Sequence, residues 1–198
     1  TDATDATGQD DYVVDYTTTS GTATRWMAGY SGPFGYPDMT ANDEKALTYT
    51  TPPLEVDTEL TGHPVVHLWV TSSADDGDFF VYLEEVESDG TATYLTEGVL
   101  RASHRQLSEP PFEYMGLPFQ RSYAADLMPL PAGEPVELVF DLQPTSNVFD
   151  AGNRIRITVT GADADNYRTP ELDPPPTVSI YRSAEYTSYI VLPVIPAE

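Results

Sequence analysis

The stretch ALTYTTPPLEVDTELTGHPVVHLWVTSSADDGDFFVYLEEVESDGTATYLTEGVLRASH (residues 46–104) decides the fold class of this chain. It consists of short runs rich in Val, Leu, Phe, Tyr and Thr, each ended by Pro, Gly or Asp, and it shows no helical period. In VVHLWVT (65–71) the side chains alternate, so Val66, Leu68 and Val70 should lie on one buried face of a strand. The stretch therefore predicts consecutive β-strands.

Runs of the same kind recur along the rest of the chain. They predict about nine strands, drawn from residues 12–16, 46–51, 65–71, 79–86, 92–95, 98–104, 135–141, 154–160, 177–182 and 186–194. The run FFVYLEEV (79–86) is apolar on both sides at first and then acidic. We expect this strand to begin buried between two layers and to run out to solvent.

One connection, residues 105–133, is much longer than the turns between the other runs. Meanders need few residues between strands, whereas a crossing from one sheet to another takes a longer excursion. We predict an all-β fold, a jelly-roll β-sandwich that forms a single domain over residues 12–198. Residues 1–11 are polar and acidic, and we expect them to be a linker or a disordered start.

Charge is the extreme property of the composition. The chain has 32 Asp and Glu residues against nine Lys and Arg residues, for a formal net charge of −23. Such a surface repels phosphate backbones and anionic lipids, so we expect no nucleic-acid partner and no membrane binding. No apolar run approaches the roughly 20 residues of a membrane helix. Cysteine is absent, which excludes disulfides and thiolate chemistry.

No catalytic constellation is recognisable in these residues. The nearest approach to a Gly-x-Ser-x-Gly nucleophile elbow is GYSGP (29–33), but its second Gly comes one residue early and Pro33 prevents the helix that should follow. We interpret Ser31 as a turn serine. His63 and His67 would stand about 13 Å apart along a strand, too far apart to bind one metal ion. We expect all three histidines, His63, His67 and His104, to be satisfied by local hydrogen bonds.

Two Asp-rich turns are weak candidates for a structural Ca²⁺ site, because Ca²⁺ takes six to eight oxygen ligands. One turn holds Asp75 and Asp78, and the other holds Asp163 and Asp165. Neither turn has the spacing of an EF-hand loop, and Asp-rich turns are expected by chance in a chain this acidic. We therefore assign no metal and no other cofactor.

The aromatic stretch RWMAGYSGPFGYP (25–37) is a second candidate site. Its Gly and Pro residues exclude a helix and indicate a shaped loop. Aromatic side chains on such a loop form a small satellite core, or they line a sugar platform or a substrate pocket. Both interpretations stay open on the residues alone.

Several motifs in a fixed order resemble one known family. They are ALTYTTPPL (46–54), LTG (60–62), VVHLWV (65–70), DF (78–79), EGVLR (97–101), TSNVF (145–149), GNRI (152–155) and SYIVLPVI (188–195). Together they are similar to the C-terminal domain of X-prolyl dipeptidyl-peptidases and cocaine esterase-like serine hydrolases. The chain departs from that pattern at Asn153, where relatives often carry His, and over residues 161–168.

The resemblance implies that this chain carries no catalytic residue. In the family the Ser-Asp-His triad belongs to an upstream α/β-hydrolase domain, which hydrolyses esters, amides or X-prolyl dipeptides. That domain is the partner we expect, with the present chain supporting it. The segment before the ALTYTTPPL-like strand lies close to the substrate pocket in relatives. By position, Trp26 and Met27 should border that pocket.

A carbohydrate-binding module is the alternative function, because galactose-binding-domain-like jelly rolls share this architecture and a fold alone does not determine function. Such a module needs solvent-exposed aromatic side chains on one sheet face or on a loop rim. The strand pattern places Trp69 in a buried position. Only Trp26 and the loop tyrosines are then left for this role.

The charge imbalance generates a first prediction. Repulsion among the acidic side chains should lower stability at low ionic strength, and salt screens it. We expect the melting temperature to rise as NaCl is added from low to molar concentration, measured by circular dichroism. Two interpretations of the acidic side chains are open: a solvated surface suited to high salt, or a soluble extracellular surface. A flat response would contradict the first.

Overall fold

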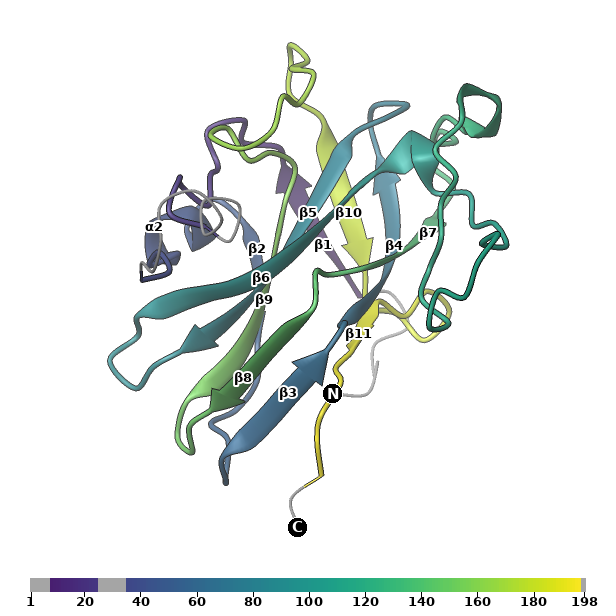
Figure 1. Ribbon diagram of the computed structural model, residues 1–198. Coiled ribbons are helices and arrows are strands. Elements are labelled where there is room, and N and C mark those ends of the chain that lie inside the picture. Colours follow the sequence, from purple (N-terminus) through teal and green to yellow (C-terminus); the bar gives the residue numbers. More distant parts are fainter. Residues whose placement is uncertain (1–7, 25–34, 197–198) are drawn as a thin grey trace.

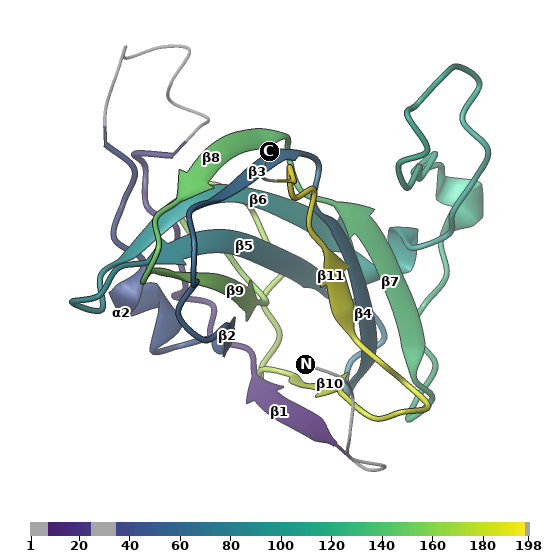
Figure 2. The same ribbon diagram turned by 90° about the horizontal axis from the view of Figure 1, so that it is seen from below.

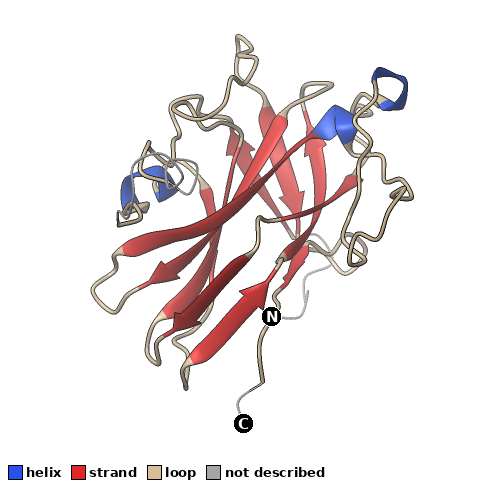
Figure 3. Cartoon of the chain, in the orientation of Figure 1, coloured by secondary structure: helices blue, strands red, loops and turns tan. Residues whose placement is uncertain are grey.

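The run at residues 65–71 forms the central strand of the larger sheet in the computed structural model, which describes residues 8–24 and 35–196. Strand β4 (Val65–Ser72) pairs antiparallel with three neighbours. A second sheet faces it, and a short pair of strands closes one end (Figure 1, Figure 2). All pairings are antiparallel. The all-β sandwich that the sequence predicts is confirmed (Figure 3).

The strands fall into three groups. The five-stranded sheet runs β1 (Gln9–Val13), β10 (Thr177–Tyr181), β4 and β11 (Tyr189–Val191), with β7 (Val136–Asp141) also paired to β4. The four-stranded sheet runs β2 (Leu47–Thr50), β9 (Arg154–Thr160), β5 (Asp78–Val86) and β6 (Ala92–Arg101). The remaining pair is β3 (Thr58–Gly62) with β8 (Thr145–Phe149). Short helical turns lie at α2 (Thr40–Asp43), η1 (Ala102–His104) and η2 (Ala124–Asp126).

Strand β5 is buried on both of its faces. Phe79, Val81 and Leu83 lie in the apolar core between the two large sheets, where the β4 residues predicted to face inward also lie. Phe80 and Tyr82 point the other way, into a second apolar cluster on the outer side of the four-stranded sheet. Alternation of side chains along a strand explains why one strand serves two cores.

The second apolar cluster is covered by the segment that contains α2. Met39, which precedes this helix, is 1% exposed and belongs to the cluster. Its backbone N–H donates to the carbonyl of Ala92, and the N–H of Tyr94 donates to the carbonyl of Pro37, at 2.7 and 3.1 Å. These bonds hold the covering segment on the edge of β6.

The sequence-based account of residues 79–86 is wrong at its acidic end. Glu84 is fully buried and Val86 is 4% exposed, so the strand does not run out to solvent. Local pattern suggests exposure because acidic residues are seldom buried. The cover provided by α2 and its flanks comes from residues about 40 positions away, which a local pattern does not contain.

Several boundaries also differ from the predicted ones. The runs expected at residues 92–95 and 98–104 form the single strand β6. Strand β1 begins at Gln9, so the expected linker over residues 1–11 extends too far. Strands β3 and β8 and helix α2 were not predicted, and the described residues hold eleven strands rather than nine. No described helix is long and apolar enough to span a membrane.

The long connection does cross between sheets, as its length predicts. It leaves β6 in the four-stranded sheet and returns as β7 in the five-stranded sheet. We call residues 105–133 the crossover arm. In both views the arm stands clear of the sheets, in teal at the right of the molecule (Figure 1, Figure 2).

Gly98 lies where β6 packs on the end of β7, so a substitution there tests this packing. A Cβ atom at this position would lie 2.6 Å from the carbonyl oxygen of Asp141 and 3.1 Å from the Cα of Leu142. We expect Gly98→Ala to lower the free energy of unfolding by about 2–3 kcal/mol, because the clash is with backbone. Gly77→Ala is the matched control, since a Cβ there meets no atom within 4 Å. Urea denaturation of both variants measures the difference, and equal stabilities would contradict this packing.

Candidate functional site

The residues predicted to border a substrate pocket, Trp26 and Met27, lie outside the described residues. The segment that leads to them is described up to Thr24, whose side chain is buried. Ser20 and Thr18 are also buried, and both bond to the loop that follows β9. The chain is therefore held firmly just before the predicted pocket residues.

Asp163 is the centre of that attachment. Its carboxylate is 1% exposed and accepts hydrogen bonds from Ser20 Oγ at 2.6 Å, Tyr82 Oη at 3.0 Å and Asn166 Nδ2 at 3.0 Å. Together these bonds join the segment before residue 25, the outer face of β5 and the loop after β9. Burial and the neighbouring Asp163 charge both raise the pKa of the Tyr82 hydroxyl, so this group stays a proton donor.

A shallow cavity of about 370 Å³ lies beside this attachment. Tyr16, Asn166 and Tyr167 contribute to its wall, together with Asp165. Asp165 accepts a hydrogen bond from Thr19 Oγ1 at 2.7 Å. Asp163 and Asp165, weak Ca²⁺ candidates on sequence, thus bond to side chains of this chain.

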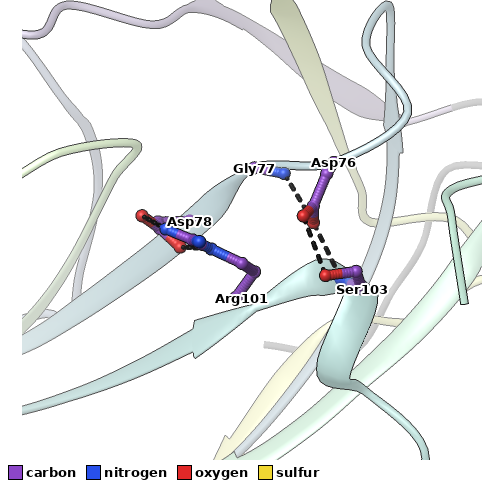
Figure 4. A network of polar contacts seen from close by, with 5 residues as sticks. All are labelled: Asp76, Gly77, Asp78, Arg101 and Ser103. Carbon is purple, nitrogen blue, oxygen red and sulfur yellow. Dashed lines mark hydrogen bonds and ion pairs between the residues drawn. The ribbon is translucent and has the colours of Figure 1, made fainter. Parts of the chain in front are cut away.

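In the acidic turn after β4, carboxylates also bond to groups of this chain (Figure 4). One carboxylate oxygen of Asp76 accepts from the backbone N–H groups of Gly77 and Ser103, at 2.9 and 2.8 Å, and the other accepts from Ser103 Oγ at 2.8 Å. Asp78 forms a two-pronged ion pair with Arg101 at 2.7 and 2.9 Å, which raises the pKa of that guanidinium. The side chain of Asp75 is exposed.

No group of three or more His, Cys, Asp or Glu side chains able to hold a metal ion occurs within residues 8–24 and 35–196. The acidic turn instead fastens both ends of the crossover arm. Asp76 holds Ser103 just before the arm, and the carbonyl of Asp75 accepts from the N–H of Leu130 near its end at 2.7 Å. The N–H of Met128 donates to the carbonyl of Ser103 at 2.8 Å.

Sequence reasoning treated residues 105–133 only as a connection. Their large apolar side chains are a signal that could have marked them, because the structure leaves many of these exposed. Phe112 is 57% exposed and Met115 is 70% exposed. Aromatic and Met residues on a polar chain would have pointed to an interaction surface.

Two of the three histidines are paired as expected, whereas the buried Nδ1 of His104 has no hydrogen-bond partner among the described residues. His63 Nδ1 lies 2.8 Å from Asp141, and His67 Nδ1 lies 2.9 Å from Glu137. Each histidine therefore has its own carboxylate partner, which confirms that both are satisfied locally.

The outer face of the five-stranded sheet carries aromatic pairs. Trp69 is partly exposed rather than buried, and its ring contacts Tyr186 at a centroid distance of 5.1 Å. His67 and Tyr189 stack in parallel at 4.3 Å. A sugar platform needs free ring faces. The Trp69 and Tyr186 rings are tilted by 52° to one another and Tyr189 is 48% exposed, so these pairs do not decide against the carbohydrate-binding alternative.

Residues 2–191 match the protein family described as the X-Pro dipeptidyl-peptidase C-terminal non-catalytic domain. The chain belongs to that family. Membership confirms the resemblance carried by the ordered motifs.

Relatives of this C-terminal domain are longer proteins. A Mycobacterium bovis protein named as a proposed serine esterase is 48% identical over 192 residues, which are 95% of this chain and 30% of that protein. Cocaine esterase of a Rhodococcus species is 31% identical over 179 residues, 84% of this chain and 28% of that protein. The chain thus spans about 30% of the length of these relatives.

A solved structure shares the fold. An aminopeptidase from a marine sediment Thaumarchaeota archaeon aligns with 96% of this chain and 33% of its own, with a TM-score of 0.70. The sequences are 19% identical, so this likeness concerns the fold alone.

One acid of the C-terminal domain is fully buried. Glu84 lies beneath the α2 segment, beside the side chains of Asp43 and Thr158. Burial and the nearby charge of Asp43 raise its pKa to about 9. Asp43 itself pairs with Arg156 at 2.6 Å and accepts from Thr158 Oγ1 at 3.0 Å. A raised pKa in a cleft would suggest catalysis. Because Glu84 is inaccessible, it is a structural group instead.

This raised pKa makes stability depend on pH. Between the ordinary value of 4.5 and about 9 the unfolded chain loses the Glu84 proton while the folded chain keeps it. The contribution of this group to stability is therefore complete below pH 4.5 and is lost as pH rises, by up to about 1.4 kcal/mol per pH unit. Glu84→Gln has no proton to lose, so its stability relative to the parent sequence should increase from pH 5 to pH 8.

Urea denaturation at several pH values measures this difference. Glu87→Gln, at an exposed position, removes one negative charge without changing a buried group and is the control. Parallel pH profiles for Glu84→Gln and the unsubstituted chain would show that Glu84 is ionised in the folded state.

Proposed function

We propose that this domain is the C-terminal part of a serine hydrolase of ester, amide or X-prolyl dipeptide substrates, where it supports the catalytic domain and borders its substrate pocket. The match to a non-catalytic C-terminal domain over residues 2–191 carries this function. Two relatives bear serine esterase or cocaine esterase in their names and are about three times as long as the matched region. Catalysis would then lie outside this chain.

Trp26 and Met27 would form the border of the pocket. Support comes from the residues that precede them: Ser20 bonds to the buried Asp163, and Asp163 in turn bonds to Tyr82 in the sheet. A segment fastened in this way to a rigid sheet can hold a pocket wall in one position, and precise positioning lowers the barrier of a reaction.

Two assays test the catalytic part of this function. The full-length protein should hydrolyse p-nitrophenyl acetate or a prolyl-nitroanilide, whereas the 198-residue chain should give no turnover above buffer. Turnover by the isolated chain would overturn the non-catalytic assignment. Inactivity of the full-length protein on every ester, amide and prolyl substrate would overturn the hydrolase assignment.

A substitution tests the border of the pocket. In the full-length protein, Trp26→Ala should change kcat/KM by about tenfold, which corresponds to about 1.4 kcal/mol. Val56→Ala is the control, because Val56 is an apolar residue that is 63% exposed before β3. Steady-state kinetics of both variants provide the comparison. Unaltered kinetics for Trp26→Ala would place the pocket elsewhere.

A further inference from the structure

We propose that the crossover arm is the surface through which this domain docks on the catalytic domain of the same polypeptide. This rests on the proposed function, and it names the contact surface that the proposed function leaves open. Apolar exposure, a fixed shape and a low charge, all found together in the arm, carry the inference.

The arm concentrates the exposed apolar surface of the described chain. Fifteen large hydrophobic residues are exposed in the described parts, and six of them lie within the 29 residues of the arm. They are Leu107, Phe112, Met115, Tyr123, Leu127 and Met128, exposed by 42–70%. Exposed apolar side chains gathered on one segment of a soluble domain are typical of an interaction site. Aromatic and Met side chains are enriched in such sites.

The outer half of the arm is held together by its own aromatic side chains. Phe112, Tyr114 and Phe119 meet edge to face, with centroid distances of 5.6–5.9 Å. The N–H of Ser108 donates to the carbonyl of Phe119 at 2.9 Å, which closes the loop that carries these rings. Gln120 Nε2 donates to the carbonyl of Val139 in β7 at 2.7 Å and ties the loop to the sheet.

Hydrogen bonds and an ion pair made by two arginines hold the inner half of the arm. The guanidinium of Arg105 donates to the carbonyls of Met128 and Pro129. Arg121 forms a two-pronged ion pair with Asp126, which is 6% exposed. The Arg121 guanidinium also lies 5.3 Å from the ring centroid of Tyr123. The arm thus presents Tyr123 in one orientation.

The backbone conformation of the arm also indicates that its shape is fixed. Met115 and Ser122 are non-glycine residues with φ of 55° and 54°, in the left-handed region. Such conformations cost free energy and persist only where the surrounding structure imposes them, and they gather at binding and switch sites. Met115, the most exposed of the large hydrophobic residues in the described chain, is one of them. A pre-shaped arm loses little conformational freedom on binding, which favours affinity.

The charge of the chain and the length of its relatives indicate which partner binds the arm. The chain carries −23, but the arm holds two arginines and three acidic residues, so it contributes only −1. A second copy of this chain would bring another −23 close to the first, and that repulsion opposes self-association. Matching relatives are about three times as long, so a covalently joined domain is present in them at high effective concentration. The catalytic domain of the same polypeptide is therefore the favoured occupant.

The test compares two pairs of substitutions in the full-length protein. Leu107→Ser with Met115→Ser removes two apolar side chains of the arm that are 50% and 70% exposed and lie outside its aromatic cluster. Val148→Ser with Val191→Ser removes two that are 52% and 51% exposed in β8 and β11, outside the arm. Calorimetry should show the arm variant separating into two unfolding transitions where the unsubstituted protein has one. Proteolysis between the domains should become about tenfold faster. The control pair should retain one transition.

The 198-residue chain with the arm substitutions should keep its melting temperature, which separates loss of docking from loss of folding. One transition in the arm variant together with two in the control pair would move the docking surface to the other face and overturn the proposal. A dimer of the 198-residue chain that the arm substitutions convert to monomer, seen by analytical ultracentrifugation, would also overturn it, with a second copy as the occupant. These readouts need no hydrolase activity, so they stand apart from a failure of the proposed function.

Discussion

Burial of β5 on both of its faces is the constraint on which the rest of the structure depends. Phe79, Val81 and Leu83 complete the core between the sheets, while Phe80 and Tyr82 require a second cover on the outer side. Because apolar burial is the main driving force of folding, the α2 segment and the loop after β9 must close over that outer face. The same closure buries Glu84 and Asp163. The α2 segment and the loop after β9 thus form a third layer over part of the two-layered sandwich.

Buried and half-buried carboxylates fasten the loops of this acidic domain. Asp163 holds the segment before residue 25, and Asp76 holds the start of the crossover arm at Ser103. Charge-assisted hydrogen bonds to backbone N–H groups and hydroxyls are stronger than neutral ones. A domain without disulfides therefore has two loops that buried or half-buried carboxylates hold in place.

The fold was predictable where it rests on short-range pattern. Alternation in the run at residues 65–71 identified the inward face of β4, and the length of the 105–133 connection indicated the crossing between sheets. Boundaries failed where distant segments decide them: β6 continues through the buried residues Thr96 and Glu97 because both pair with β5 and the backbone of Gln143 bonds to both. For the candidate site, the sequence located the acidic turns but suggested for them only a weak candidate role in binding Ca²⁺. Their hydrogen-bond donors, such as Ser20 and Ser103, lie far along the chain.

The sequence by itself determined the all-β class, the family and the absence of a recognisable nucleophile, because these depend on residue types and on spacing within a few positions. Only the tertiary structure decided which acids are buried, which loops they hold and where apolar side chains remain uncovered. The physical reason is that the free energy of a carboxylate or an apolar side chain depends on its surroundings. In this chain those surroundings come from residues far apart in the sequence, 143 positions in the case of Ser20 and Asp163.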